Sequence, residues 1–442
     1  MASLRQVIER WSRDQVLALA PDAPSQKAAQ GVAAPGRWSL RGTTGSVLYG
    51  ECGGSGSKPY RACVDLTEPA YRCSCPSRKF PCKHALGLLL LWSADGVPVA
   101  EAAPQWVTEW LDGRAERAAR STARLEAART RAAEPARDGG APDGGAESVR
   151  HARVAAGMAE LERWLADQVR QGLATSAEHD WDGLAKRLID AQAPGVAGVV
   201  SRLARVRAED NWPGRLLEEY ALIDLLAVAY RRRADLPAPL AQTVQIRTGF
   251  PVTREEVLAG PPVRDHWHVL GRRDDEQDRL TARRVWLRGR ATGRAALILS
   301  FAPPGQSLDA SLVTGTTIDA DLTFYPGAAP LRALVATRHP TPSPTGAAGS
   351  DVPAGVGPEE ALEEVARVLA EDPWTESWPL VLTGVIPGRT MIGGLPLHPR
   401  ARDPWRLIAV SGGHPVTVAA EWTPQGLRPL TTWDDEGTAV IL

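Results

Sequence analysis

The stretch YRCSCPSRKFPCKHALGLLLLW, residues 71–92, contains three of the five cysteines of the chain and one of its eight histidines. Its metal-binding side chains follow the spacing C-x-C-x6-C-x-H at Cys73, Cys75, Cys82 and His84. Zinc takes four tetrahedral ligands of this kind, thiolate sulfur and imidazole nitrogen. The spacing therefore predicts one structural Zn2+ ion, bound by these four residues just before an almost unbroken apolar run.

The spacing requires a strand, a loop and a helix. Residues i and i+2 of a strand point to the same face, so Cys73 and Cys75 offer two sulfurs side by side. The next six residues span up to ~20 Å, which is enough to bring Cys82 back at the start of a helix. A Cys3His set has no open position, which favours a structural ion over a catalytic one. The alternative is a cluster of free thiols or a redox pair, with His84 incidental.

Cations and aromatic rings surround the ligands: Arg72, Arg78, Lys79, Lys83, Tyr71 and Phe80. No acidic residue lies between Glu68 and Asp95. The cations predict contacts with nucleic-acid phosphates, and the two rings are expected to be available for stacking on bases. Alternatively, the cations only offset the net negative charge of a zinc ion with three thiolates.

The apolar run from Leu86 to Trp92 predicts a helix that is buried on nearly all sides. Such a helix anchors in a domain core and is unsuited to reading a DNA groove. We expect it to pack against the N-terminal helix or against Trp106 and Trp110. The exposed basic loop, residues 76–81, is then the part of the finger that a partner touches.

The ligand pattern, with strands before it and a helix after it, resembles the SWIM-type zinc finger, whose form is C-x-C-x(n)-C-x-H with a variable gap. The run CPSRKFPCKHALGLLL is also similar to bacterial proteins classed as SWIM zinc finger proteins. The resemblance covers about residues 40 to 95. It implies binding to DNA or to protein partners rather than catalysis.

Composition places the chain among ordinary multidomain proteins. At 442 residues it should divide into two or three domains. Residues 5–13 are too charged for a signal segment, and no apolar run reaches the ~18 residues of a membrane span, so we expect a cytoplasmic protein without membrane contact. The preference for arginine over lysine is typical of a GC-rich bacterial genome. Residues 1–134 hold 18 basic and 13 acidic residues, a balance of +5, and the remainder holds 33 and 39, a balance of −6. This asymmetry permits an anionic partner for the N-terminal part.

We expect an α+β multidomain chain with four parts. Residues 1–112 combine an amphipathic helix over 2–19 with a small ββα-type zinc module, whose finger core is 40–95. Residues 113–148 are a charged helix and a Gly/Pro/Ala linker. Periodic apolar segments predict a helical region over 149–238.

Residues 239–442 are expected to be β-rich, because short segments alternate apolar and polar residues. The predicted strands include 243–250, 266–271, 282–289, 294–301, 405–412 and 415–422. One helix is predicted over 358–372, since it opens with acidic residues. Residues 339–358 have the composition of a disordered loop.

Two weaker patterns contain residue types that bind metals. Cys52 and Cys63 lie on the hairpin before the finger, where we expect buried structural thiols rather than ligands. His266 and His268 share one face of a strand beside the acidic residues 274–276. A second metal site has this appearance, but a solvated strand face followed by an acidic turn is favoured.

These features predict a non-enzymatic, zinc-binding adaptor whose finger binds nucleic acid or, equally, a protein within a bacterial complex. The partner-contacting residues are expected to be Arg72, Arg78, Lys79, Phe80 and Lys83. No catalytic residue and no small-molecule substrate is indicated, because hydrolase, zinc-protease and dinucleotide motifs are missing from the sequence. The competing hypothesis is an enzyme with its active site in the C-terminal half, for which the finger recruits substrate.

Overall fold

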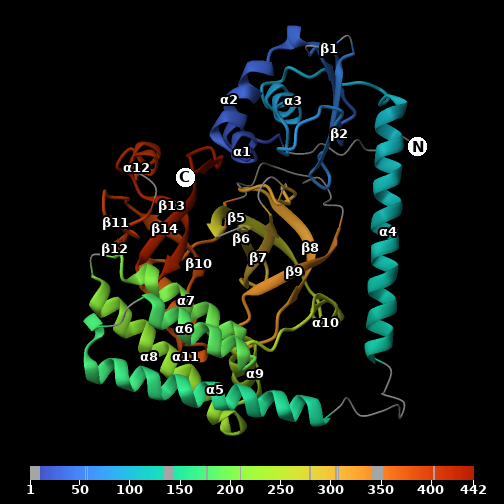
Figure 1. Ribbon diagram of the computed structural model, residues 1–442. Helices are drawn as coiled ribbons and strands as arrows, with labels where there is room; N and C mark the ends of the chain where they lie inside the picture. Colours follow the sequence, from blue (N-terminus) through green and yellow to red (C-terminus); the bar gives the residue numbers. More distant parts are fainter. Residues whose placement is uncertain are drawn as a thin grey trace.

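The computed structural model in Figure 1 shows four parts along the chain: a small N-terminal module, a long single helix, a helical bundle, and a barrel packed against a second sheet. The structure describes residues 10–54, 56, 58–133, 144–175, 178–209, 211–277, 280–303, 306, 308–339, 352–401 and 404–442. Helices and sheets are both extensive, which confirms the predicted α+β multidomain class.

The N-terminal module is a four-stranded antiparallel sheet with helices on one face. Its elements are α1 (Arg13–Ala18), α2 (Ala23–Val32), the 3-10 turn η1 (Pro35–Arg37), β1 (Trp38–Thr43), β2 (Val47–Cys52), β3 (Tyr60–Asp65), β4 (Ala70–Cys73) and α3 (Lys83–Ser93). Of the predicted helix over 2–19, residues 2–9 lie outside the described residues. Helix α1 begins only after Ser12, whose side chain forms a capping box with Gln15.

Helix α3 is the centre of the module's core. Residues 84 to 92 are all buried, and they pack against α1, α2 and one face of the sheet. Trp11 meets the ring of Trp92 edge-on, with 5.9 Å between ring centroids. Gly87 permits the close approach of α2, because a Cβ there would lie 2.6 Å from Cγ2 of Val32. The predicted anchoring of this helix beside the N-terminal helix is confirmed.

The other face of the sheet is covered by the start of α4 (Gln105–Ala133), through Val107, Trp106 and Trp110. Beyond these first turns α4 runs beside the barrel as a single helix, as Figure 1 shows, and reaches α10 (Arg254–Ala259). Most of the predicted linker at 135–148 lies outside the described residues. Its last residues, 144–148, belong to the next helix.

The bundle consists of α5 (Gly144–Gln171), η2 (Leu173–Thr175), α6 (Glu178–Asp190), α7 (Pro194–Val206), α8 (Trp212–Arg231), η3 (Arg233–Asp235) and α9 (Ala238–Thr248). One apolar core, with Trp181 and Tyr220 near its centre, joins these helices. The helical region is thus confirmed, but the strand predicted at 243–250 is wrong. The buried side chains of α9 lie on one face of the helix: Thr243, Val244 and Thr248. Their spacings of one, four and five residues fit the period of a helix and not that of a strand.

The barrel is formed by β5 (Val263–Gln277), β6 (Leu280–Gly289), β7 (Ala295–Ala302), β8 (Thr317–Phe324) and β9 (Arg332–Arg338), closed in the order β5-β6-β7-β9-β8. β7 and β9 pair in parallel, and the other pairs are antiparallel. This is the strand order of an OB-type barrel, a five-stranded Greek key. Its interior is filled by apolar side chains, among them Trp267, Leu287 and Leu322.

A second sheet covers the outside of the barrel. It contains β10 (Trp378–Val385), β13 (Val416–Thr423), β14 (Gly426–Trp433) and β15 (Ala439–Ile441), and its neighbours are α11 (Pro358–Glu371), α12 (Trp405–Ser411) and the hairpin β11 (Met391–Ile392) and β12 (Leu395–Pro396). Trp286 of β6 and Leu297 of β7 pack against Leu430 and Trp433 of this sheet. In OB-type barrels this outer face binds oligonucleotides or oligosaccharides. Here Trp286 and Leu297 of that face are buried against the second sheet.

Two further predictions for the C-terminal part are corrected or fall outside the structure. The strand predicted at 405–412 is helix α12, in which Leu407 and Ser411, four residues apart, are buried, and Gly412 ends the helix with a φ of 54°. Residues 340–351 of the loop predicted at 339–358 lie outside the described residues. The remaining strands and the helix that begins at Pro358 lie where the sequence predicts them.

Candidate metal centre

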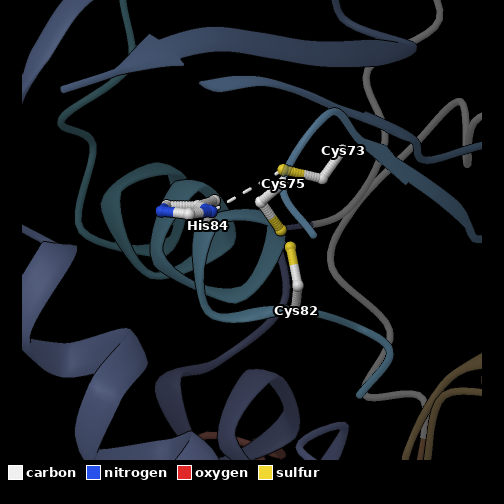
Figure 2. Close-up of side chains that lie close together, drawn as sticks. All are labelled: Cys73, Cys75, Cys82 and His84. Carbon is white, nitrogen blue, oxygen red and sulfur yellow. Dashed lines mark hydrogen bonds between the residues drawn. The ribbon is translucent and has the colours of Figure 1, made fainter. Parts of the chain in front are cut away.

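The four predicted ligands are brought together by the end of β4 and the start of α3. Cys73 is the last residue of β4, and Cys75 follows in the loop. Cys82 is the N-cap of α3, and His84 lies in the first turn. Figure 2 shows the sulfur atoms and the imidazole clustered at this junction. The local structure is therefore the strand, loop and helix that the spacing requires.

The distances suit one tetrahedral ion. The ligand atoms all lie within 4.8 Å of one another, and Sγ of Cys73 is 3.7 Å from Nδ1 of His84. Zinc–sulfur bonds of about 2.3 Å put tetrahedral ligand atoms roughly 3.8 Å apart. The set of three thiols and one imidazole is also the donor chemistry that zinc prefers. Cys73, Cys75, Cys82 and His84 are thus positioned to hold one zinc ion.

The three thiols differ in acidity. A hydrogen bond from the Cys73 thiol lowers the pKa of Cys82, and bonds from His84 and the backbone N–H of Ala85 act in the same direction. The same bond raises the pKa of Cys73, and burial raises the pKa of Cys75. The N-terminus of a helix also favours the thiolate at Cys82. Cys82 is therefore the ligand most readily deprotonated, and thiols that are still protonated release their protons when a metal binds.

Tyr60 is a neighbour of the centre that the sequence did not single out. Its ring lies on that of His84, with 4.9 Å between centroids and 31° between planes, and His84 is only 3% exposed. Gly54 leaves room for this ring, since a Cβ there would lie 2.4 Å from it. The ring shields the imidazole from water and holds its orientation, as groups around metal ligands commonly do.

The predicted partner-contacting residues are divided by the structure. Arg72, Arg78 and Lys83 are exposed. Lys79 is also exposed, but it forms an ion pair of 2.5 Å with Asp22 of α2. Phe80 is half-buried and packs edge-on against Tyr71, with 6.0 Å between centroids.

Tyr71 is not available for stacking on bases, so that prediction is wrong. Its side chain is buried, and its hydroxyl donates a hydrogen bond of 3.1 Å to the carbonyl of Ala310 in the barrel. It faces the barrel because alternate residues of β4 point to opposite sides.

The weaker patterns do not form a second metal site in the part of the chain that the structure describes. Cys52 and Cys63 are fully buried thiols, as predicted, and burial raises the pKa of both. Nδ1 of His268 pairs with the hydroxyl of Thr317 at 2.9 Å, while His266 is exposed.

The acidic turn predicted at 274–276 is wrong, because these residues continue strand β5. Asp274 pairs with Arg283 at 2.6 Å, and Asp275 pairs with Arg273 at 3.0 Å. Basic residues on β5 and β6 thus neutralise the carboxylates, which makes the extended conformation favourable there.

Comparison with protein families agrees with this geometry. Residues 63–92 match the family model described as SWIM zinc finger, and residues 149–248 match the SWIM-associated four-helix bundle domain. The chain thus contains a SWIM zinc finger, whose metal centre lies in the N-terminal module, and a SWIM-associated bundle formed by α5 to α9. No curated protein and no solved structure matches the chain. None of the described helices is long and apolar enough to cross a bilayer.

Proposed function

We propose that the chain is a non-enzymatic, cytoplasmic adaptor whose zinc finger binds the phosphate backbone of a nucleic acid. The observation that carries the proposal is the pairing of charges in the finger region. Residues 10–100 contain eleven Lys or Arg and six Asp or Glu, a balance of +5.

Each of the six acidic residues already has a basic partner. The pairs are Asp14 with Arg406, Asp22 with Lys79, Glu51 with Arg61, Asp65 and Glu68 with Arg114, and Asp95 with Arg10. No carboxylate of the described residues forms an ion pair with Arg78 or Lys83, which flank the zinc ligands. A zinc ion with three thiolates offsets only about one of the unpaired positive charges. An anionic partner is therefore expected at the zinc loop, by which we mean residues 74–83, from the end of β4 to the first residue of α3.

The mode of binding follows from the burial of α3. Because this helix lies inside the core, the finger offers loop side chains rather than a helix to its partner. Loop cations contact phosphates, which carry no sequence information directly. We expect binding that depends steeply on salt and weakly on sequence.

The test is fluorescence anisotropy with a labelled oligonucleotide over a series of salt concentrations. Replacing Arg78 and Lys83 with alanine should lower the salt slope by about 2, if each contacts one phosphate. The matched control is Arg13→Ala with Lys27→Ala, two exposed cations of the same module outside the zinc loop. No binding at low salt overturns the proposal and directs attention to a protein partner.

The enzyme hypothesis has less support. The acids that would complete a site with His266 and His268 are already neutralised, Asp274 by Arg283 and Asp275 by Arg273. Affinity purification from the native host tests both hypotheses, because it recovers nucleic acid and protein partners together. A metabolic enzyme activity that survives Cys82→Ser would contradict the adaptor role.

A further inference from the structure

A cavity of about 420 Å³ lies where the zinc module, α4 and the barrel meet. Its walls are residues 68–71 and Phe80 of the module, Arg114 of α4, and residues 308–311 and Arg338 of the barrel. In Figure 1 the module lies directly above the barrel with α4 alongside. The volume is within the range of about 300–1,000 Å³ that is usual for small-molecule sites.

The walls are held in place by buried contacts between the two parts. The Tyr71 hydroxyl bonds to the carbonyl of Ala310 at 3.1 Å, and Nε2 of Gln15 bonds to the carbonyl of Thr314 at 3.0 Å. Ala310 and Val313 belong to the same apolar core as α3. The cavity is therefore preformed, and a ligand need not order it.

Arg338 provides donors that the protein leaves unused. Its guanidinium donates to the carbonyl of Ser311 at 3.3 Å and to the Ser311 hydroxyl at 2.8 Å. A guanidinium has five N–H groups, so others remain available. No carboxylate of the described residues forms an ion pair with it within 4.0 Å. Burial lowers its pKa, although the charges of Asp309 and Glu68 act in the opposite direction. A desolvated cation of this kind is stabilised by an anionic group in the cavity.

Asp309 provides the complementary acceptor. Its carboxylate accepts bonds from the backbone N–H of Ser311 at 2.8 Å and from the Ser311 hydroxyl at 3.0 Å. A carboxylate has about four acceptor positions, so part of its capacity is free. Asp309 is exposed, whereas Arg338 is half-buried, which places the acceptor nearer the mouth and the donor deeper.

The remaining charged residues cancel each other. Arg114 pairs with Glu68 at 3.5 Å and with Asp65 at 3.4 Å. The lining thus holds two cations and two anions: Arg114, Arg338, Glu68 and Asp309. A phosphate dianion is poorly matched to such a site, and a molecule with one charge of each sign is well matched.

We propose that this cavity binds a small zwitterion of the amino-acid type, with its carboxylate on Arg338 and its ammonium group on Asp309. The inference goes beyond the proposed nucleic-acid binding and does not depend on it. Because Phe80 belongs to the zinc loop, the ligand would contact both the module and the barrel and stabilise their docking.

The test is isothermal titration calorimetry of the full-length, zinc-loaded chain with the twenty common L-amino acids. For the tightest of them, the methyl ester removes the carboxylate charge and the N-acetyl derivative removes the ammonium charge. Arg338→Gln should weaken binding of the amino acid by at least about tenfold. The variant should then bind the amino acid no more tightly than its methyl ester. Asp309→Asn should bind the amino acid no more tightly than its N-acetyl derivative. The matched control is Arg290→Gln, an exposed arginine of the barrel outside the cavity.

If Arg338→Gln does not fold, Ser311→Ala and Arg338→Lys test the same site, and both should weaken the amino acid more than Arg290→Gln does. The proposal is overturned if no amino acid binds with a dissociation constant below about 10 mM. It is also overturned if inorganic phosphate binds and its binding depends on Arg338. Nucleic-acid binding should be unchanged in Arg338→Gln, so the two proposals fail separately.

Discussion

The zinc module and the barrel are both small β structures, but they are stabilised in different ways. The module gathers its metal ligands from twelve consecutive residues, 73–84, and its core surrounds one helix. The barrel closes strands that lie far apart in the chain, since β5 pairs with β8 and β7 pairs with β9. A small module depends on a local metal for its fold, whereas a larger closed barrel depends on apolar side chains that many strands contribute.

The two regions also differ in their charges. The acids of the module are paired in a way that leaves cations free at the zinc loop. Between the barrel and the second sheet, the carboxylate is the buried partner: Glu421 is 1% exposed and lies between Arg273 and Arg428. Cations of the module are thus left unpaired at the surface, whereas charges in the C-terminal part join the barrel to the second sheet.

The largest expected effect is loss of the metal. Cys82→Ser removes one of the four ligands and should reduce bound zinc to well below one ion per chain. A structural zinc site contributes about 10–16 kcal/mol to folding. We expect the module to unfold while the barrel keeps its structure. Zinc content by mass spectrometry, together with hydrogen exchange along the chain, measures both effects.

The control for this experiment is Cys63→Ser, a buried cysteine of the same sheet that is not a ligand. It should keep its zinc. Full zinc retention in Cys82→Ser would falsify the metal centre, and unfolding of the barrel along with the module would remove the distinction between the two regions.

The next effect concerns Glu421. Glu421→Ala leaves Arg273 and Arg428 without their shared carboxylate inside the protein, which should cost about 3–5 kcal/mol of unfolding free energy. Urea unfolding followed by tryptophan fluorescence measures it. Glu218→Ala, which removes an exposed partner of Arg215, should change stability by less than about 1 kcal/mol. Equal effects from the two variants would mean that the buried pair does not hold the barrel to the sheet.

A pH effect is expected in the same region. Burial and then the charge of Arg428 lower the pKa of His398 to about 4. The unfolded chain therefore binds more protons than the folded chain between about pH 4 and pH 6.5, and stability rises with pH in that window by at most about 1.4 kcal/mol per unit. His398→Asn should flatten this part of the curve, and His414→Asn, at an exposed position, should not.

The smallest effect is expected at the ion pair between Asp22 and Lys79 in the module. A hydrogen bond from Lys79 lowers the pKa of Asp22 to about 2. The pair stabilises the fold above about pH 4, and its contribution is lost as the pH falls from about 4 to 2; an exposed pair of this kind contributes about 0.2–1 kcal/mol. Asp22→Asn should also free Lys79 and tighten oligonucleotide binding slightly at low salt. Weaker binding in that variant would argue against phosphate contacts at the zinc loop.

The metal centre could be predicted from the sequence because its determinants are local. Four ligands at a spacing that one strand, one loop and one helix satisfy leave little freedom for the chain. The burial of α3 is equally local, since a helix that is apolar on all sides has only a core to occupy. Three of the five barrel strands, β5, β6 and β7, followed from the alternation of apolar and polar residues, which is also local.

Errors arose where short segments suit two structures. Residues 243–250 and 405–412 are apolar enough for a strand, but α9 and α12 form because neighbouring helices or a glycine C-cap favour them. The role of Tyr71 depended on a distant partner, the carbonyl of Ala310, which no local pattern reveals.

The sequence by itself determined the zinc ligands and the helix behind them, because these depend on residues that are neighbours in the chain. Only the tertiary structure decided which cations of the zinc loop are free, since Asp22 lies 57 positions from the lysine that it neutralises. It also decided that the outer face of the barrel is covered and that a cavity opens beneath the finger. Both features arise from contacts between segments far apart in sequence, and such contacts depend on how the parts dock rather than on any local pattern.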